Sequence, residues 1–151
     1  MVIKKMKLTL IVMTLAAIMF AGSASAFDPD DLQKLKNNNA CKSCDLSGAN
    51  LAGTDLALAD LTSASLDSAI LLEANLSGAN LTGASLWLAN LTDANLEDAD
   101  LGFANLKGAN LKDVSLYKAD LTGADLGSAI VMDIILCNTT MPDGSVNDSG
   151  C

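Results

Sequence analysis

The segment "LSGANLTGASLWLANLTDANLEDADLGFANLKGANLKDVSL" (residues 76–116) repeats one pattern every five residues. A leucine returns at every fifth position from Leu76 to Leu116, and the residue two places before it is almost always alanine. Five residues turn an α-helix roughly 140° past one full turn, so these leucines would be spread around every face of a helix. In a straight strand, an odd spacing would send successive leucines to opposite faces. The period therefore excludes both a regular helix and a regular strand.

The same pattern extends from Leu46 to Leu136, which makes nineteen repeats of five residues. We call the residue at each of these nineteen positions the central residue; eighteen are leucine and the other is Val131. We call the residue two before each central residue the inner residue, the one directly before it the outer residue, and the one two after it the corner residue. Inner residues are alanine in fifteen repeats, and outer residues are mostly Asn, Asp or Ser. Six of the eight glycines in the repeats are corner residues, where glycine eases a left-handed turn. The pattern predicts a chain that winds as a polygonal coil, with leucine and alanine inside.

Four segments carry a resemblance to a known family: "ADLTSASL" (59–66), "ANLTGASL" (79–86), "ANLEDADL" (94–101) and "ANLKGANL" (104–111). They resemble the pentapeptide-repeat proteins, whose consensus is A(D/N)LXX, and the resemblance covers residues 44–138. It implies an all-β fold, a right-handed quadrilateral β-helix with four repeats per coil. The period by itself does not distinguish three sides from four.

The first residues are typical of an export signal. Three lysines precede an apolar run over residues 8–20, and small residues lead to a cleavage site after Ala26. The run is shorter than the roughly 20 residues that span a membrane. We therefore predict a signal peptide over residues 1–26 and an exported mature chain. Removal of its three lysines would change the net charge from −9 to −12.

The ends of a coil need covering, because an open coil exposes its core and its unpaired strand groups. Residues 27–43 are predicted to form an N-terminal cap with a short helix over 28–36, begun by Asp28 and Pro29. The β-helix is predicted over 44–138, and residues 139–151 are predicted to form a C-terminal capping tail.

The composition leaves little room for catalysis. The chain has no histidine, which excludes an imidazole base and a Ser-His pair. Acidic outer and corner residues are typical of a solvated wall. We expect no catalytic residue, no metal and no cofactor. We expect a protein partner of unknown identity, with a homodimer left open, and neither nucleic acid nor, after signal cleavage, a membrane.

The cysteines are predicted to form disulfides after export. If the coil has four repeats, as the resemblance implies, Cys44 and Cys137 lie roughly 22 Å apart along the rod, whereas a disulfide needs Cα atoms within about 7 Å. The predicted pairs are therefore Cys41 with Cys44 and Cys137 with Cys151. Cys44 occupies an inner position where a buried free thiol would also fit, which leaves oxidation of the first pair open.

Four apolar residues fall on positions that the coil turns outward: Ile70, Leu72, Trp87 and Leu88. With four-sided coils, residues 68–72 stack beneath 88–92, so these side chains meet around one corner. They define an expected interaction patch, since exposed apolar residues within a polar rim often mark a contact surface.

The expected function is that of a non-catalytic exported scaffold, in the periplasm, the thylakoid lumen or the extracellular space. The family resemblance and the acidic charge give an alternative, an acidic mimic of DNA that binds a topoisomerase. The signal peptide opposes it, because such enzymes are cytosolic. A thiol oxidoreductase that uses Cys41 and Cys44 is a weaker alternative, because the βαβ context of such enzymes is missing.

Overall fold

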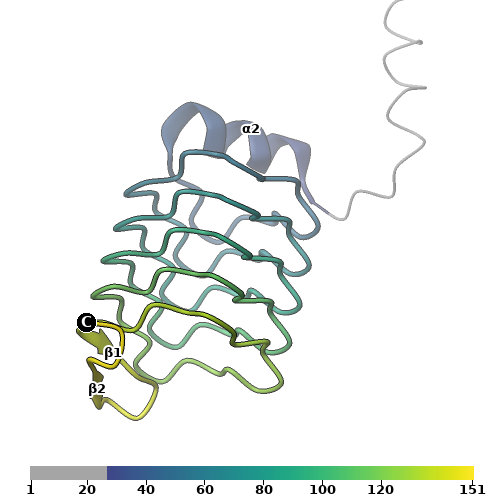
Figure 1. Cartoon of the computed structure of the whole chain (residues 1–151). Coiled ribbons are helices and arrows are strands. Elements are labelled where there is room, and N and C mark those ends of the chain that lie inside the picture. Colours follow the sequence, from purple (N-terminus) through teal and green to yellow (C-terminus); the bar gives the residue numbers. More distant parts are fainter. Residues whose placement is uncertain (1–26) are drawn as a thin grey trace, which may run out of the picture.

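The computed structural model describes residues 27–151, and the predicted signal peptide lies outside the described residues. The described chain begins with helix α2 (Pro29–Asn38) and ends with two short strands, β1 (Thr139–Thr140) and β2 (Val146–Asn147). Between them the chain winds as a stack of coils, with α2 at one end and the strands at the other (Figure 1). None of the helical residues described forms a span long and apolar enough to cross a membrane.

The coils are joined by parallel bridges between outer residues that are twenty residues apart in the sequence. One turn of the coil therefore takes four pentapeptides. The bridges begin with Ala40 and Asp60 and end with Asp120 and Thr140. The coil thus continues about one pentapeptide beyond the sequence pattern at each end, through residues whose side chains no longer match the consensus.

Each pentapeptide uses its backbone in the same way. The N–H of central Leu66 donates to Ser85 in the following coil at 2.7 Å, and the carbonyl of Leu66 accepts the N–H of Ala69 at 3.0 Å, which closes a turn. Every corner residue from Ser43 to Asn138 has a positive φ, between 53° and 71°, as the second central residue of a type II turn requires. Most of these corner residues are not glycine. The positive φ alone therefore does not explain why glycine occupies some corners and not others.

The core consists of the central and inner residues, as predicted. Central leucines from Leu46 to Leu121 are no more than 4% exposed. The inner alanines leave room for the leucines of neighbouring sides, and the stack forms a single apolar cluster along the rod.

The outer Asn and Asp residues have a local role that solvent exposure does not explain. Their Oδ1 atoms accept the N–H of the residue two places later, as in Asn50 to Ala52 at 3.1 Å and Asn95 to Glu97 at 2.9 Å. This side-chain bond stabilises the turn and satisfies a donor that no neighbouring coil reaches. The preference for Asn and Asp at this position is therefore a turn preference.

Helix α2 closes the first coil. The Asp28 side chain caps the helix by accepting the N–H of Asp30 at 2.9 Å, and Leu35 is buried against the core. The Asp31 carboxylate accepts the N–H of Asp45 at 2.9 Å, so a side chain of the helix satisfies part of the coil's first edge.

The C-terminal tail closes one side of the last coil. The β1 strand pairs with β2 in an antiparallel hairpin, and the N–H of Leu121 donates to Thr140 at 2.8 Å, so the hairpin continues the coil. Thr139 is buried, and its hydroxyl donates to the carbonyl of Leu116. The tail nevertheless leaves central Val131 47% exposed, so this end of the core is less covered than the end beneath α2.

Candidate functional site

The predicted patch residues lie on two successive coils. Ile70 forms a bridge with Asn90 in the next coil, which places Ile70 and Leu72 on one wall, with Trp87 and Leu88 at the corner that leads to it. Ile70, Trp87 and Leu88 are 41%, 46% and 49% exposed, and Leu72 is half-buried. We call these four residues the apolar group.

An acidic residue of the preceding coil holds the backbone of Trp87. The N–H of Trp87 donates to the Asp67 carboxylate at 3.2 Å, and the Ser85 hydroxyl bonds to the same oxygen. In most repeats this N–H would be satisfied by an outer Asn or Asp, but the outer residue here is Ser85. Asp67 takes over that role from the preceding coil, a contact that the five-residue spacing does not reveal.

The side chain of Leu88 is directed toward the following coil. A β-carbon added to Gly108, one coil later, would lie 2.7 Å from the Cδ2 atom of Leu88. The glycine therefore provides the space that Leu88 fills. As a result, Leu88 extends the apolar group away from Ile70, along the corner of the rod.

A column of acidic residues borders the wall of Ile70 and Leu72. Four corner residues, each twenty residues after the last, form this column, which we call the acidic ladder: Glu73, Asp93, Asp113 and Asp133. Successive members stand on neighbouring coils, roughly 4.8 Å apart by the strand spacing.

Lys112 directly precedes Asp113 of the acidic ladder and forms an ion pair with it. The hydrogen bond to Asp113 raises the pKa of Lys112 above its ordinary value, and the charges of Asp113, Asp93 and Asp133 add to the effect. One lysine thus faces several carboxylates, and the wall keeps a negative potential.

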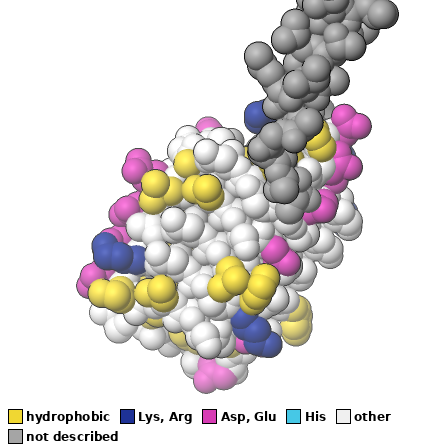
Figure 2. All heavy atoms as spheres, turned by 90° about the vertical axis from the view of Figure 1, so that its right-hand side faces the viewer, with side chains coloured by type: hydrophobic (Ala, Val, Ile, Leu, Met, Phe, Trp, Pro, Cys, Tyr) yellow, Lys and Arg dark blue, Asp and Glu magenta, His cyan; other side chains and the backbone are white. Residues whose placement is uncertain are grey.

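One face of the molecule carries both hydrophobic and acidic side chains (Figure 2). Hydrophobic side chains form separate islands on a largely polar face, with acidic side chains along its edges. No single apolar groove crosses this face.

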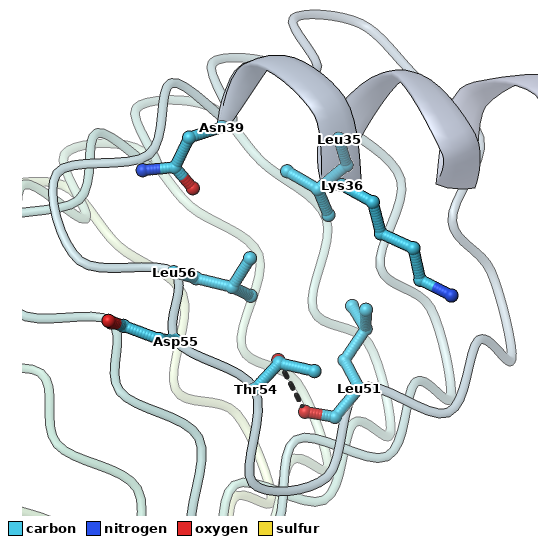
Figure 3. A pocket seen from close by; sticks show the side chains of 7 residues that line it. All are labelled: Leu35, Lys36, Asn39, Leu51, Thr54, Asp55 and Leu56. Carbon is cyan, nitrogen blue, oxygen red and sulfur yellow. Dashed lines mark hydrogen bonds between the residues drawn. The ribbon is translucent and has the colours of Figure 1, made fainter.

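A hollow of about 320 Å³ lies between α2 and the first coil. Figure 3 shows its lining residues: Leu35, Lys36, Asn39, Leu51, Thr54, Asp55 and Leu56. The Asn39 amide donates to the carbonyl of Ala57, and the Thr54 hydroxyl donates to that of Leu51, so both groups are already satisfied. The charged ends of Lys36 and Asp55 point away from one another (Figure 3). The hollow therefore lacks convergent polar groups for catalysis.

The structure pairs Cys41 with Cys44 and Cys137 with Cys151, with Cα separations of 5.3 and 4.9 Å. This is the pairing predicted from the sequence. Cys41 and Cys44 are 0% and 3% exposed beneath α2, and reactive thiols need access to their substrate. Asp31 lies close to both sulfurs, but disulfide sulfurs lack the thiolate charge with which cysteine binds zinc. Cys41 and Cys44 therefore have a structural role in this fold.

The coil and its walls define a β-helix built from short repeats, without convergent catalytic groups in the hollow or at the cysteines. The family model of pentapeptide repeats matches residues 41–71, 59–98 and 89–127 in eight copies. The chain belongs to the pentapeptide repeat family, which confirms the family prediction.

Three solved structures illustrate the similarity. A pentapeptide repeat protein of the Arabidopsis thaliana thylakoid lumen is 34% identical, with 68% of this chain and 71% of that chain covered and a TM-score of 0.62. One from Nostoc Pcc 7120 is 35% identical, with 67% and 82% covered and a TM-score of 0.57. One from the cyanobacterium Cyanothece 51142 is 30% identical, with 70% and 92% covered and a TM-score of 0.51. No curated protein matches the chain.

Proposed function

We propose that the chain is a non-catalytic exported scaffold whose wall, formed by the apolar group and the acidic ladder, binds another protein. The observation that carries the proposal is the exposure of Ile70, Trp87 and Leu88 around one corner of the rod, beside the acidic ladder. Leu58 and Phe103 are also exposed, but each stands at another corner. The scaffold is a right-handed quadrilateral β-helix, with residues 27–43 and 139–151 as its caps. Its rigidity supports binding, because a preformed surface loses little conformational entropy when it docks.

The partner surface is expected to be apolar and basic. Exposed apolar side chains favour burial against a partner, and the acidic ladder favours lysine and arginine beside them. Ion pairs at the rim of an interface weaken with salt. Binding should therefore weaken as the ionic strength rises, and the apolar contacts should supply the remaining affinity.

Export is part of the proposal, to the periplasm, the thylakoid lumen or the extracellular space. Its supports are the signal pattern over residues 1–26 and two disulfides, which persist in oxidising compartments. A similar protein comes from a thylakoid lumen. The acidic DNA mimic remains the second candidate, favoured by the acidic ladder and opposed by the signal pattern and by Lys112 within the ladder.

The test is capture of partners from an extract of the exported compartment with matched double variants. Trp87→Ser with Leu88→Ser removes half of the apolar group. Leu58→Ser with Phe103→Ser is the control, because these residues are 79% and 72% exposed at other corners. We expect the first pair to lose a partner that the control retains. If the first pair leaves every captured partner and the oligomeric state unchanged, the proposal is wrong.

Trp87 also reports binding directly, because it is the only tryptophan of the chain. As a residue, Trp87 is 46% exposed. A partner that covers the apolar group should shift its fluorescence emission to shorter wavelength. A captured protein that leaves this emission unchanged would bind elsewhere on the rod.

A further inference from the structure

The wall that carries Ile70 also carries a second apolar pair, close to the C-terminal end of the rod. Three successive parallel bridges connect Ile70 with Ile130, so both side chains stand in one column of outer residues. Ile130 and Met132 are 49% and 52% exposed. The carbonyl of Met132 accepts the N–H of Asp113 in the preceding coil at 2.9 Å, so the wall continues in register to this pair.

The two apolar pairs have the same layout. We call Ile70 with Leu72 the first anchor and Ile130 with Met132 the second anchor; in each, an outer residue is followed two places later by a second apolar residue. The anchors are three coils apart, roughly 14 Å by the strand spacing. The two coils between them carry polar residues at the same positions: Asn90, Thr92, Asn110 and Lys112. A partner that uses both anchors must therefore span this polar stretch.

The two edges of this wall differ in character. One edge carries Leu88, with Trp87 beside it, and both are exposed. The opposite edge is the acidic ladder. Among residues 27–151, the ion pairs involve only one member of the ladder, Asp113, so the other three carboxylates are available to a cation from a partner. The wall is thus complementary to a segment that is apolar along one side and basic along the other.

An α-helix that lies along the rod has the required spacing. Residues i and i+11 of a helix point in nearly the same direction and lie roughly 16.5 Å apart. This distance exceeds the anchor spacing by about 2 Å, which the flexible side chain of Met132 can accommodate. One helical turn rises about 5.4 Å, close to the coil spacing of about 4.8 Å, so one basic residue per turn can follow the acidic ladder.

An extended strand matches the length of the wall but not its width. Residues i and i+4 of a strand lie roughly 13 Å apart and point to the same side. The residues between them alternate, so every second side chain points away from the wall. A strand therefore offers one row of side chains, whereas an amphipathic helix offers an apolar stripe and a basic stripe side by side.

We propose that the partner docks an amphipathic α-helix of about four turns along this wall. Its apolar stripe contacts the two anchors and Leu88, and its basic stripe lies on the acidic ladder. This inference rests on the proposed function, because it names the kind of partner segment that binds the same wall.

The test measures the affinity of three synthetic peptides of equal length and charge for the full chain, purified as the cell processes it, by fluorescence anisotropy. The helix probe has leucines at i and i+11 and one lysine per turn beside them. The spacing probe moves the second leucine to i+7, and the strand probe alternates its residues with leucines at i and i+4. We expect the helix probe to bind about tenfold or more tightly than the other two, because only the helix probe reaches both anchors and the ladder.

Variants of the last coil test the second anchor. Ile130→Asn introduces the residue type that most outer positions carry, so the coil should fold normally. Ile135→Asn is the matched control, because Ile135 is the outer residue of the next wall and is 47% exposed. Burial of an isoleucine side chain favours binding, so Ile130→Asn should weaken the helix probe about tenfold. Ile135→Asn should leave its affinity unchanged.

Variants of one coil test the acidic ladder. Asp93→Asn removes a charge of the ladder, and Asp98→Asn removes one from the next corner. Both residues are exposed corner residues, with φ of 58° and 55°, and asparagine tolerates this backbone conformation. Asp93→Asn should weaken the helix probe and reduce the salt dependence of binding, whereas Asp98→Asn should have a smaller effect on both.

Failure of the helix inference can be told apart from failure of the proposed function. A helix probe that does not bind, a strand or spacing probe that binds as tightly, or equal losses in Ile130→Asn and Ile135→Asn would overturn the helix. Equal effects of Asp93→Asn and Asp98→Asn would do the same. The proposed function is decided separately, by whether Trp87→Ser with Leu88→Ser loses a captured partner.

Discussion

The Phe103 ring lies over Gly123, one coil further along the rod, where a β-carbon added to Gly123 would come within 2.6 Å of the ring's Cδ1 atom. Leu58 and Leu88 lie over Gly78 and Gly108 in the same way. These three are the large apolar corner residues of the repeats, and each is followed by a glycine at the next corner of its column. The positive φ does not explain glycine at these corners, because non-glycine residues adopt a positive φ at fifteen other positions. Glycine stands there because it provides space for the side chain of the neighbouring coil.

This relationship predicts a coupling between Phe103 and Gly123. Gly123→Ala should cost roughly 1–2 kcal/mol for the left-handed backbone, plus the cost of displacing the ring. Gly53→Ala is the control, because Gly53 has a similar φ and nothing within 4 Å of an added β-carbon. Urea unfolding should show Gly123→Ala as the more destabilising change, and the excess should disappear in a Phe103→Ala background. If Gly123→Ala cost the same stability with Phe103 as with Phe103→Ala, the ring would not contribute to the effect.

The core predicts a strong contrast between neighbouring residues. Leu96 is fully buried, and Leu96→Ala should lower the free energy of unfolding by roughly 2–5 kcal/mol through a core cavity. Asn95→Ala removes one turn hydrogen bond, to the N–H of Glu97, and should cost only about 1 kcal/mol. Chemical denaturation of both variants measures the difference. Similar losses would contradict the assignment of inside and outside positions.

The turn of Asp60 predicts a pH-dependent contribution to stability. The Thr62 hydroxyl at 2.6 Å, followed by the Thr62 N–H, lowers the pKa of Asp60. A carboxyl group with a lowered pKa stabilises the fold above its unfolded pKa of about 3.9, and that contribution is lost as the pH falls through the folded pKa. Thr62→Val should therefore destabilise the chain more at pH 7 than near pH 2.

The control for this prediction is Thr92→Val. The Thr92 hydroxyl makes the same bond to a neutral amide, Asn90, at 2.7 Å. Its removal should cost the same at both pH values, because Asn90 does not titrate. Unfolding at the two pH values measures both variants, and an equal pH dependence for the two would refute the role of the Asp60 charge.

The second disulfide predicts a local loss of structure. Cys137 and Cys151 are 14 residues apart, and such a loop is worth roughly 3 kcal/mol in the chain-entropy model. Replacing both with serine should release the hairpin and increase amide exchange at Leu121 and Gly123, whose N–H groups donate to Thr140 and Pro142. Exchange near Leu66 should not change, since repeats contact only their neighbours.

Non-reducing peptide mapping of the exported protein tests the pairing itself. We expect a link between Cys41 and Cys44 and another between Cys137 and Cys151. A link between either N-terminal cysteine and either C-terminal cysteine within one chain would contradict the geometry of the rod.

The sequence by itself determined the coil. A leucine at every fifth residue, with alanine two places before it, can be buried throughout only if the chain winds as a coil. The family and the capping helix that begins at Asp28 also followed from local patterns. The apolar group was also visible, because Ile70 and Trp87 interrupt a polar pattern. These features depend on residues close together in the chain, whose preferences can be summed directly.

Only the tertiary structure decided how neighbouring coils fit together. The space that Gly123 leaves for Phe103, the bond from Trp87 to Asp67 and the continuation of the coil through Thr140 all join residues about twenty apart. The local preferences of single residues do not predict these contacts, because each contact depends on the number of residues per coil. The exposure of Val131 is of the same kind. The central residues Leu126, Val131 and Leu136 fit the buried pattern of the sequence, but Val131 is exposed and the two leucines are only half-buried, because no further coil covers them.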